Sequence, residues 1–360
     1  MLDLYAKILN IIGIPRVFAE ITWPLFPFIC IAALLIFVVI FLVLMERKVL
    51  AWLTIRKGPN RVGPNGFLQT FADAIKLLFK EDIMPSETNK ILFTLAPIVV
   101  FVPIMVIYGL MPFTEHFVAI NLAVGLFLVF ALSSITTVGI VLAGWASNNK
   151  YSLLGGMRSA AQAISYEVPL VIAVLSIAAL AGSLNLTEIV KAQTGGVFAW
   201  NIFPAFIGFI VLFICAIAEV NRIPFDLPEA ESELVSGYNT EYSGMKFALF
   251  FLAEYAALFV ISVLVVTLFL GGYLPPLNDY LSVIFFGEAI KNPTLMNAFI
   301  HLEQGFWLVA KVYVLLFLII WIRGTLPRLR ADQLMSFSWK FLLPLAFLNL
   351  ILVSIIKFIF

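Results

Sequence analysis

The chain has 360 residues, of which 62% are hydrophobic and 12% are charged, and its formal net charge is +1. Its mean hydropathy is +1.07, whereas an ordinary soluble domain carries about 25% charged residues. The composition therefore excludes a soluble globular protein and indicates a chain embedded in lipid. Cys30 and Cys215 lie inside apolar runs, and His116 and His301 have no ligand-like neighbours, so we expect neither a disulfide nor a metal site.

Eight apolar runs are long enough to cross a bilayer, which takes about 20 residues per helix. We predict an all-α, polytopic integral membrane protein that forms a single transmembrane helical domain over residues 1–360. We expect no signal peptide at the N-terminus, because it carries Asp3 and Glu20 and its first long apolar run is followed by ERK rather than by a small-residue cleavage site. The predicted spans are 25–45, 91–113, 118–146, 158–183, 202–219, 245–270, 302–322 and 340–359.

The stretch after the first span carries a turn-rich segment, RKGPNRVGPNG, and then an amphipathic pattern, FLQTFADAIKLLFK. One helical face holds Phe67, Phe71, Ile75, Leu78 and Phe79. The other holds Gln69, Asp73, Lys76 and Lys80. This pattern predicts an interfacial helix that lies along the membrane or packs across the other helices, with Asn65 as its N-cap.

Charged residues at the inner end of the first span form a rim beside this helix. They are Glu46, Arg47 and Lys48, and we expect them to line a cleft for a polar head group together with Arg56, Arg61, Asp73 and Arg222. The aromatic side chains of Phe67, Phe71 and Phe247 would suit a hydrophobic tail.

Two predicted spans contain a carboxyl group, Glu167 in AISYEVPL and Glu254 in FFLAEYAALF. An ionisable group at a helix centre costs about 2.5–3.5 kcal/mol, so such residues are functional candidates. Pro169 cannot donate a hydrogen bond to the carbonyl of Ser165, and we expect a kink with an unpaired carbonyl that holds water. Buried carboxyls are suited to exchange protons.

A structural alternative remains open for these carboxyl groups, namely a purely structural ion pair with an arginine or with Lys311 in the seventh span. One lysine cannot neutralise Glu167, Glu219 and Glu254 together, which favours a functional role.

The segment EVNRIPFDLPEAESELVSGYNTEY follows the fifth span and carries one cation, Arg222. Its carboxylates are Glu219, Asp226, Glu229, Glu231, Glu233 and Glu241. Pro228 and the acids around it predict a helix start between Asp226 and Glu229. Helix-dipole effects do not explain Glu229 and Glu233, which repel at i,i+4. We therefore expect a like-charge cluster in which some members stay protonated, acting as a proton inlet or relay.

Most of the 22 lysines and arginines lie in or beside the loops that follow the odd-numbered spans. These inside loops are roughly 46–90, 147–157, 220–244 and 323–339. Positive residues accumulate on the cytoplasmic or matrix side of membranes. Both termini are thus expected on the periplasmic or intermembrane side.

Five motifs together carry a specific resemblance to a known family. They are ERKVLAWLTIRKGPNRVGPNG, FADAIKLLFKED, GMRSAAQAISYEVPL, AEVNRIPFDLPEAESELVSGYNTEYSGMKFALFFLAEY and RGTLPRLRADQLM. The chain resembles the membrane protein of respiratory complex I that is called its H subunit or subunit 1, from about residue 25 to 350. The first 20 residues and the 271–300 loop have no matching motif.

The resemblance implies the membrane part of a proton-translocating NADH:quinone oxidoreductase, in a bacterial or mitochondrial inner membrane. Quinone would be a substrate, and no cofactor would be held tightly by this chain. FMN and iron–sulfur clusters would belong to partner subunits. The implied partners are an iron–sulfur subunit, hydrophilic-arm subunits, small and antiporter-like membrane subunits and the lipid bilayer, with no nucleic acid.

The resemblance also assigns residues to two sites. Positions that line or support the quinone chamber are matched by Glu46, Arg47, Arg56, Asp73 and Arg222, with Phe247 near the entry. The acidic path that links quinone chemistry to proton translocation is matched by Glu167, Glu219, Asp226, Glu229, Glu231, Glu233 and Glu254, with Arg158 nearby.

Three alternatives remain open at this level. A membrane anchor of an energy-converting hydrogenase would share the spans and glutamates but would not need a quinone tunnel. A stand-alone ion transporter would leave the long charged inside loops without a partner. A purely structural scaffold would not explain glutamates within the spans.

Overall fold

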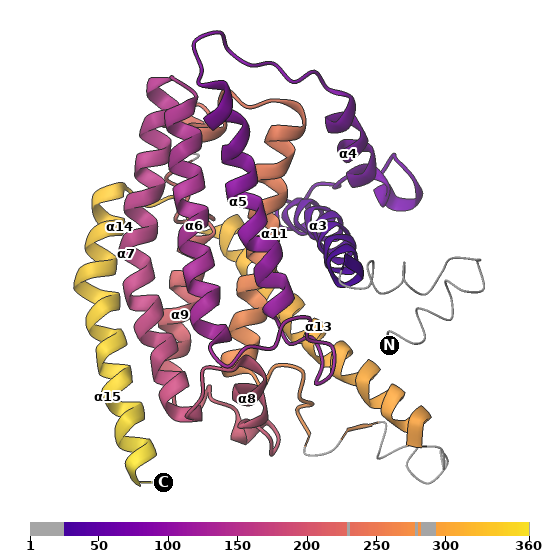
Figure 1. Ribbon diagram of the computed structural model, residues 1–360, viewed down its shortest axis with the longest axis vertical. Helices are drawn as coiled ribbons and strands as arrows, with labels where there is room; N and C mark the ends of the chain where they lie inside the picture. Colours follow the sequence, from indigo (N-terminus) through magenta and orange to yellow (C-terminus); the bar gives the residue numbers. More distant parts are fainter. Residues whose placement is uncertain (1–24, 229–230, 278–279, 282–292, 360) are drawn as a thin grey trace.

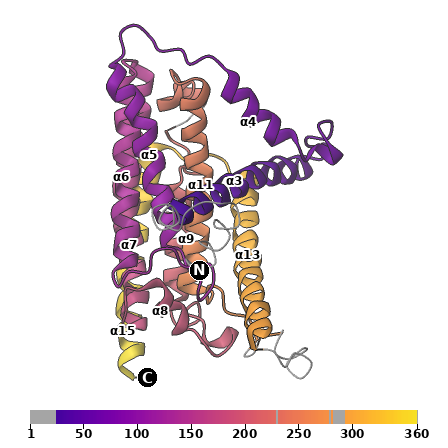
Figure 2. The ribbon, with the colours of Figure 1, turned by 45° about the vertical axis from the view of Figure 1, so that its right-hand side comes forward.

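The computed structural model describes residues 25–228, 231–277, 280–281 and 293–359, and every regular element in these ranges is a helix. Most of the long helices stand side by side in an upright bundle (Figure 1). Helix α3 runs at a large angle to them, and α4 stands apart from the bundle beside α3 (Figure 2). The predicted all-α class is confirmed.

Seven stretches among the described residues are long and apolar enough to cross a membrane, as expected of a polytopic membrane protein. They comprise α3 (Leu25–Leu53), α5 (Lys90–Leu110), α6 (Gly125–Ala146), α7 (Lys150–Ala181), α11 (Gly244–Phe269), α13 (Pro293–Thr325) and the rod formed by α14 (Ala331–Phe337), η4 (Ser338–Leu342) and α15 (Leu343–Ile359). Helix α9 (Phe206–Glu219) is apolar but shorter. The count of eight spans therefore stays a prediction.

Short helices occupy the connections between these long ones. They are η1 (Pro64–Gly66), α4 (Gln69–Phe79), α8 (Leu186–Lys191), η2 (Val197–Ala199), α10 (Glu231–Leu234) and η3 (Gly237–Asn239).

Several helices extend beyond the apolar runs from which they were predicted. Helix α3 continues to Leu53 and carries Glu46 and Arg47 on its last turns. Helix α7 begins at Lys150, where Asn149 accepts a hydrogen bond from the Tyr151 amide (2.9 Å). Hydropathy marks the part of a helix that dissolves in lipid, whereas backbone hydrogen bonding and capping set its ends.

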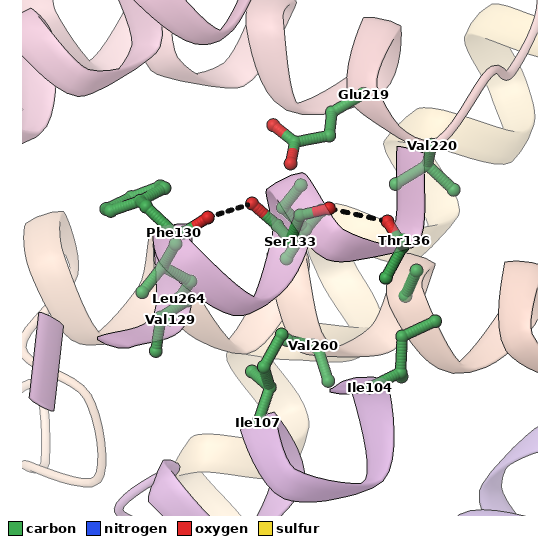
Figure 3. A pocket seen from close by; sticks show the side chains of 12 residues that line it. Ile104, Ile107, Val129, Phe130, Ser133, Thr136, Glu219, Val220, Val260 and Leu264 are labelled. Atoms are coloured by element: carbon green, nitrogen blue, oxygen red, sulfur yellow. Dashed lines mark hydrogen bonds between the residues drawn. The ribbon is translucent and has the colours of Figure 1, made fainter. Parts of the chain in front are cut away.

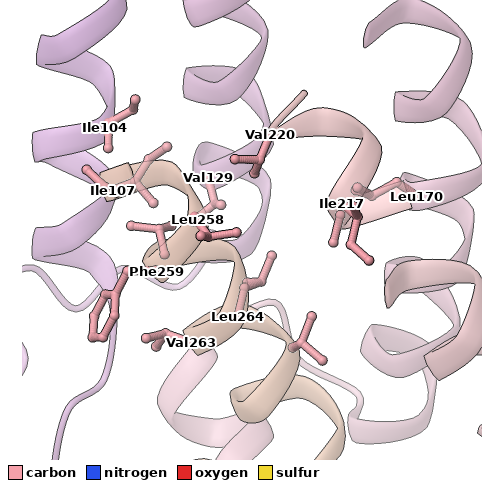
Figure 4. Packing of buried hydrophobic residues seen from close by; sticks show 14 of the residues in the cluster. Ile104, Ile107, Val129, Leu170, Ile217, Val220, Leu258, Phe259, Val263 and Leu264 are labelled. Atoms are coloured by element: carbon pink, nitrogen blue, oxygen red, sulfur yellow. The ribbon is translucent and has the colours of Figure 1, made fainter. Parts of the chain in front are cut away.

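The helices that carry the site pack closely against one another. A Cβ atom at Gly144 of α6 would lie 2.6 Å from the Ser152 carbonyl oxygen of α7. Small residues allow this close approach, which is a common way to pack helices in a membrane. The buried apolar side chains of α5, α6, α7, α9 and α11 meet in one core (Figure 4). Many large apolar side chains elsewhere are exposed, as expected for surfaces that face lipid or partner subunits.

The turn-rich segment after α3 differs from the prediction in one detail. Asn65 does not cap the amphipathic helix, which begins at Gln69 after Leu68 and has no side-chain cap. Asn65 instead takes a left-handed conformation with φ of 53° inside η1. Its carbonyl accepts a hydrogen bond from Lys48 Nζ (2.8 Å), which ties the turn to α3.

Helix α4 itself forms as predicted, and its apolar side chains Phe71, Ile75, Leu78 and Phe79 are exposed. Its position at the membrane interface stays a prediction.

Candidate functional site

Arg222 is the centre of a buried ionic network. Its guanidinium contacts the Glu46 carboxylate of α3 through Nη1 (3.1 and 3.2 Å to the two oxygens). Its Nε lies 2.9 Å from Oε1 of Glu254 on α11. Arg222 and Glu46 are each only 4% exposed. Two carboxylates from different helices, that of buried Glu46 and that of partly buried Glu254, therefore share one cation.

Two further side chains complete this network. Arg323, near the end of α13, donates a hydrogen bond to Glu46. The guanidinium carbon of Arg222 lies 4.3 Å from the centre of the Tyr255 ring, a cation–π contact. Three transmembrane helices, α3, α11 and α13, thus meet the loop after α9 at one charged point.

The loop that carries Arg222 is held by Gln162 of α7, which is fully buried. Its Nε2 donates to the carbonyls of Ala218 (2.6 Å) and Phe225 (2.7 Å), on either side of Arg222. These bonds tie the end of α9 and the loop beyond Arg222 to α7.

The remaining residues of the predicted quinone chamber lie around α3 and α4. Asp73 of α4 accepts a hydrogen bond from Arg47 Nη1 of α3 (2.5 Å), so the two helices are joined by an ion pair. Phe247 is partly buried and stacks on Phe251, with ring centroids 6.3 Å apart. Arg56 is exposed, and its Nε donates to Thr54 two residues earlier (3.2 Å), away from the network around Arg222.

Two predicted relay residues meet the same turn of α6. Ser134 donates a hydrogen bond to the Glu167 carboxylate of α7. The neighbouring Ser133 lies beside the Glu219 carboxylate at the end of α9 (Figure 3). Glu167 and Glu219 are 52 positions apart in the chain, and the fold places each of them beside one of two adjacent serines.

Glu219 and Ser133 line a cavity of about 70 Å³. A space of about 10–15 Å³ holds one water molecule, so this cavity has room for several. Most of its wall is apolar and comes from α5, α6 and α11, including Ile104, Val129 and Leu264 (Figure 3). A carboxyl group and two hydroxyls, those of Ser133 and Thr136, are available to such waters.

The expected unpaired carbonyl beside Glu167 is not found. Pro169 leaves the Ser165 carbonyl without its helical donor, but the hydroxyl of Ser338 donates to it (2.6 Å). Helix α7 continues without interruption from Lys150 to Ala181. The prediction of an unpaired carbonyl at Ser165 was wrong because a distant serine supplies the missing donor. The kink and the water beside Glu167 stay predictions.

The described carboxylates of the acidic segment each have a hydrogen-bond partner from outside the segment. Asp226 accepts from Arg328 (3.0 Å), Glu233 from Arg158 (2.7 Å), and Glu241 from Asn149 (2.6 Å). Glu219 lies beside Ser133. These donors lie far away in the sequence, so the spacing of the acids did not point to them. The clustering of the acids and their shared protonation stay predictions.

Glu229 lies outside the described residues, and of Glu231 only the backbone, at the start of α10, is described. The predicted helix start between Asp226 and Glu229 and the repulsion between Glu229 and Glu233 therefore stay predictions. The hydrogen bond from Arg158 holds the pKa of the Glu233 carboxyl below its usual value.

Lys311 does not neutralise the carboxyl groups. Its ammonium donates to three carbonyl oxygens beyond the end of α11, those of Leu270 (2.7 Å), Gly272 (3.0 Å) and Leu274 (2.7 Å). It also lies 4.2 Å from the centre of the Trp200 ring. This lysine satisfies backbone groups at a helix end, a structural role.

Sequence reasoning missed several partners of the site. Arg323, Arg328, Ser134, Gln162 and Ser338 each contact a predicted residue or its loop. The arginines lie in the motif RGTLPRLRADQLM, whose charges were used only for sidedness. Serine and glutamine within apolar spans were a usable signal, because buried polar side chains need hydrogen-bond partners.

Fold and site together define a polytopic membrane protein with a charged network and a polar cavity among its helices. A model of the NADH dehydrogenase family matches residues 26–354. The chain is 51% identical over 335 residues to the H subunit of NADH-quinone oxidoreductase from Brevibacillus brevis, covering 91% of this chain and 93% of that protein. It is 49% identical over 340 residues to the H subunits from Bacillus mycoides and Bacillus cereus, covering 93% of this chain and 95% of each relative.

The chain belongs to the NADH dehydrogenase family, as a membrane subunit of NADH-quinone oxidoreductase, that is, of respiratory complex I. The resemblance drawn from the five motifs is confirmed. The hydrogenase anchor, the stand-alone transporter and the scaffold find no support in these comparisons.

Proposed function

We propose that this subunit forms part of the quinone chamber of the complex and transmits the effect of quinone reduction to proton translocation through its carboxyl groups. The network around Arg222 carries this proposal. It joins Glu46, assigned to the chamber, to Glu254, assigned to the acidic path, through one buried cation. A change of charge near one carboxylate therefore acts on the other across a single guanidinium.

The chamber residues suit a quinone by their chemistry. Arg47 and Asp73 place a donor and an acceptor at the junction of α3 and α4, suited to a polar head group. Phe247 and Phe251 offer an apolar aromatic surface for the hydrophobic tail on the neighbouring helix α11. We place the entry from the bilayer between α3, α4 and α11.

The path for charge runs from this network to Glu219, which lies three residues before Arg222 in the chain. Glu219 and Glu167 meet the adjacent serines of α6, and waters in the cavity would connect to Glu219. Asp226 and Glu233, held by Arg328 and Arg158, form the branch nearer the inside loops. Glu229, Glu231 and Arg56 belong to this proposal only through the family resemblance.

The remaining assignments complete the proposal. Electrons would come from an iron–sulfur cluster in a partner subunit, with FMN further away in the hydrophilic arm. Antiporter-like subunits would receive the signal from Glu167. The inside loops would face the cytoplasm or matrix.

Two variants test the two parts of this proposal, the quinone chamber and the proton relay, in one assay. The assay uses the assembled complex in proteoliposomes with NADH and a soluble quinone. Arg47→Leu removes a charged donor, so we expect the KM for quinone to rise about tenfold or more, the equivalent of about 1.4 kcal/mol. Glu167→Gln removes an exchangeable proton, so we expect fewer protons translocated per electron, with quinone reduction continuing.

Matched controls separate these effects from general damage. Arg330→Leu changes an exposed arginine and should leave the KM unchanged, and Glu188→Gln changes an exposed glutamate and should leave the proton yield unchanged. An unchanged KM in Arg47→Leu would remove the chamber assignment. Full proton translocation in Glu167→Gln would remove the relay.

A further inference from the structure

The hydroxyl of Ser338 replaces a missing backbone donor next to Glu167. In an unbroken helix the amide of residue 169 would donate to the carbonyl of Ser165, and Pro169 has no such hydrogen. Ser338 Oγ donates to this carbonyl at 2.6 Å. Ser338 is fully buried, so water cannot readily take its place. An unsatisfied buried carbonyl is costly, which makes this bond a strong constraint on the backbone.

The same segment of the chain holds the two residues immediately before Glu167 in three further ways. Tyr166 Oη donates to the Leu334 carbonyl (3.0 Å). Trp339 Nε1 donates to Ser165 Oγ (3.3 Å), and that hydroxyl lies 3.1 Å from the Met335 sulfur. Residues 334–339 therefore clamp the turn of α7 that bears the carboxyl group.

A π-helical turn, η4 (Ser338–Leu342), sets the orientation of this clamp. Pro344 cannot donate to the Lys340 carbonyl, and the wider turn absorbs that defect. Within this turn the Leu343 amide donates to the Ser338 carbonyl, five residues back. Ser338 opens this turn, and its hydroxyl donates to the Ser165 carbonyl of α7.

Glu167 is consequently held from two sides. Ser134 of α6 donates to its carboxylate, while Ser338 holds the backbone turn between residues 165 and 169 that encloses it. If the hydroxyl of Ser338 were lost, the turn would be free to shift and the carboxylate would lose its fixed distance from α6.

We propose that Ser338 is a positioning residue for Glu167: its hydroxyl fixes the proline-interrupted turn of α7 so that the carboxyl group stays aligned with Ser134 and the cavity beside Glu219. This inference rests on the proposed relay role of Glu167. Ser338 exchanges no proton with the path itself. Its effect is on proton translocation per electron, not on quinone reduction.

The test compares Ser338→Ala, Ser338→Thr and Ser338→Cys in the assembled complex reconstituted into proteoliposomes. We expect Ser338→Ala to lower the number of protons translocated per electron and to leave the KM for quinone unchanged. Ser338→Thr keeps the hydroxyl and should restore the yield. Ser338→Cys, with its weak donor, should lie between them. Ser354→Ala is the matched control, because Ser354 is an exposed serine of α15 that donates only to its own helix, at Leu350.

Infrared difference spectroscopy adds a readout that a change in assembly alone would not move. The carboxyl band that disappears in Glu167→Gln should shift in Ser338→Ala and return in Ser338→Thr. If Ser338→Ala fails to assemble, the comparison of Ser338→Cys with Ser338→Thr decides the question in the same way.

The outcomes separate this inference from the function on which it rests. A normal proton yield in Glu167→Gln overturns the relay itself. A reduced yield in Glu167→Gln, with a normal yield and an unshifted band in Ser338→Ala (or in Ser338→Cys, where the alanine variant is absent), overturns only the positioning role of Ser338.

Discussion

At the scale of single residues, Arg222 shows how a charge is kept inside an apolar protein. Removing an ion from water costs several kcal/mol, and this is offset only when partners are close and well oriented. Arg222 has two carboxylates and an aromatic ring around it. Glu46 in turn forms ion pairs with two arginines, Arg222 and Arg323. Each member therefore depends on the others.

This dependence predicts a large effect from Glu46→Gln. The substitution leaves Arg323 and one side of Arg222 without a carboxylate, and breaking a buried ion pair typically costs about 3–5 kcal/mol. We expect a clear fall in the thermal midpoint of the purified complex and a lower yield of assembled complex on native gels.

The exposed pair of Arg330 and Asp332 provides the control, because its atoms are 3.6 Å apart and both side chains are more than 70% exposed. Exposed pairs contribute about 0–1 kcal/mol. If Asp332→Asn lowered the midpoint as much as Glu46→Gln, the network around Arg222 would not have the structural weight assigned to it.

At the scale of helices, α7 and α11 each contain a defect that another helix repairs. Pro169 interrupts hydrogen bonding in α7, and Ser338 supplies the donor. Helix α11 ends in the turn that contains Gly271 and Gly272, both with positive φ, and Lys311 of α13 supplies donors to three carbonyls there. In a membrane, backbone groups must find partners within the protein, which explains both arrangements.

Lys311→Met tests the repair of α11. We expect faster hydrogen exchange at the amides of residues 270–274, because the carbonyls that hold this turn lose their donor, with little change near the start of α11. Mass spectrometry of the complex in detergent measures this exchange by peptide.

Lys357→Met is the corresponding control, since Lys357 is exposed, lies near the end of α15 and donates to the Ala179 carbonyl, away from the turn at residues 270–274. Unchanged exchange at 270–274 in Lys311→Met would show that Lys311 does not hold the turn.

At the scale of the whole molecule, the connection from α13 to α15 links the two halves of the proposed site. Arg323 contacts Glu46, Arg328 contacts Asp226, and the Leu329 amide donates to the Pro224 carbonyl (3.1 Å). The same connection then reaches α7 at Leu334 and Ser338. One continuous stretch thus contacts the charged network, the acidic segment and the turn beside Glu167.

The sidedness of the molecule leads to a further prediction. Lys150 is the first residue of α7, Phe198 follows the other end of that helix in η2, and both are exposed. Because basic residues accumulate on the negative side of a membrane, we expect Lys150→Cys to react with an impermeant maleimide only in inverted vesicles. Phe198→Cys should react only in right-side-out vesicles.

The unsubstituted chain serves as the background, with Cys215 buried and Cys30 partly buried in their helices. Labelling after detergent treatment shows that both introduced thiols are reactive. The reversed pattern of labelling would overturn the predicted orientation.

Much of the fold was predictable because the relevant signal is local. A run of about 20 apolar residues is itself the reason that a helix enters lipid, and period and composition were enough to predict the long apolar helices and the helix α4. The carboxyl groups at membrane depth were found in the same way, since their cost makes them conspicuous. The predictions of helix ends, including the start of α4, were less accurate, because capping and backbone hydrogen bonding decide where a helix begins and ends.

The sequence by itself determined that this chain lies in a membrane, which long segments are apolar enough to cross it and which of them carry carboxyl groups. Only the tertiary structure decided what each charge meets. Glu46 and Arg323 are separated by 277 positions, and Ser165 and Ser338 by 173. Hydrogen bonds and ion pairs act over a few ångströms, so the fold, not the spacing along the chain, selects their partners. For that reason Asp226 and Glu233 meet arginines that their spacing did not indicate, and the expected unpaired carbonyl beside Glu167 became a bond to Ser338.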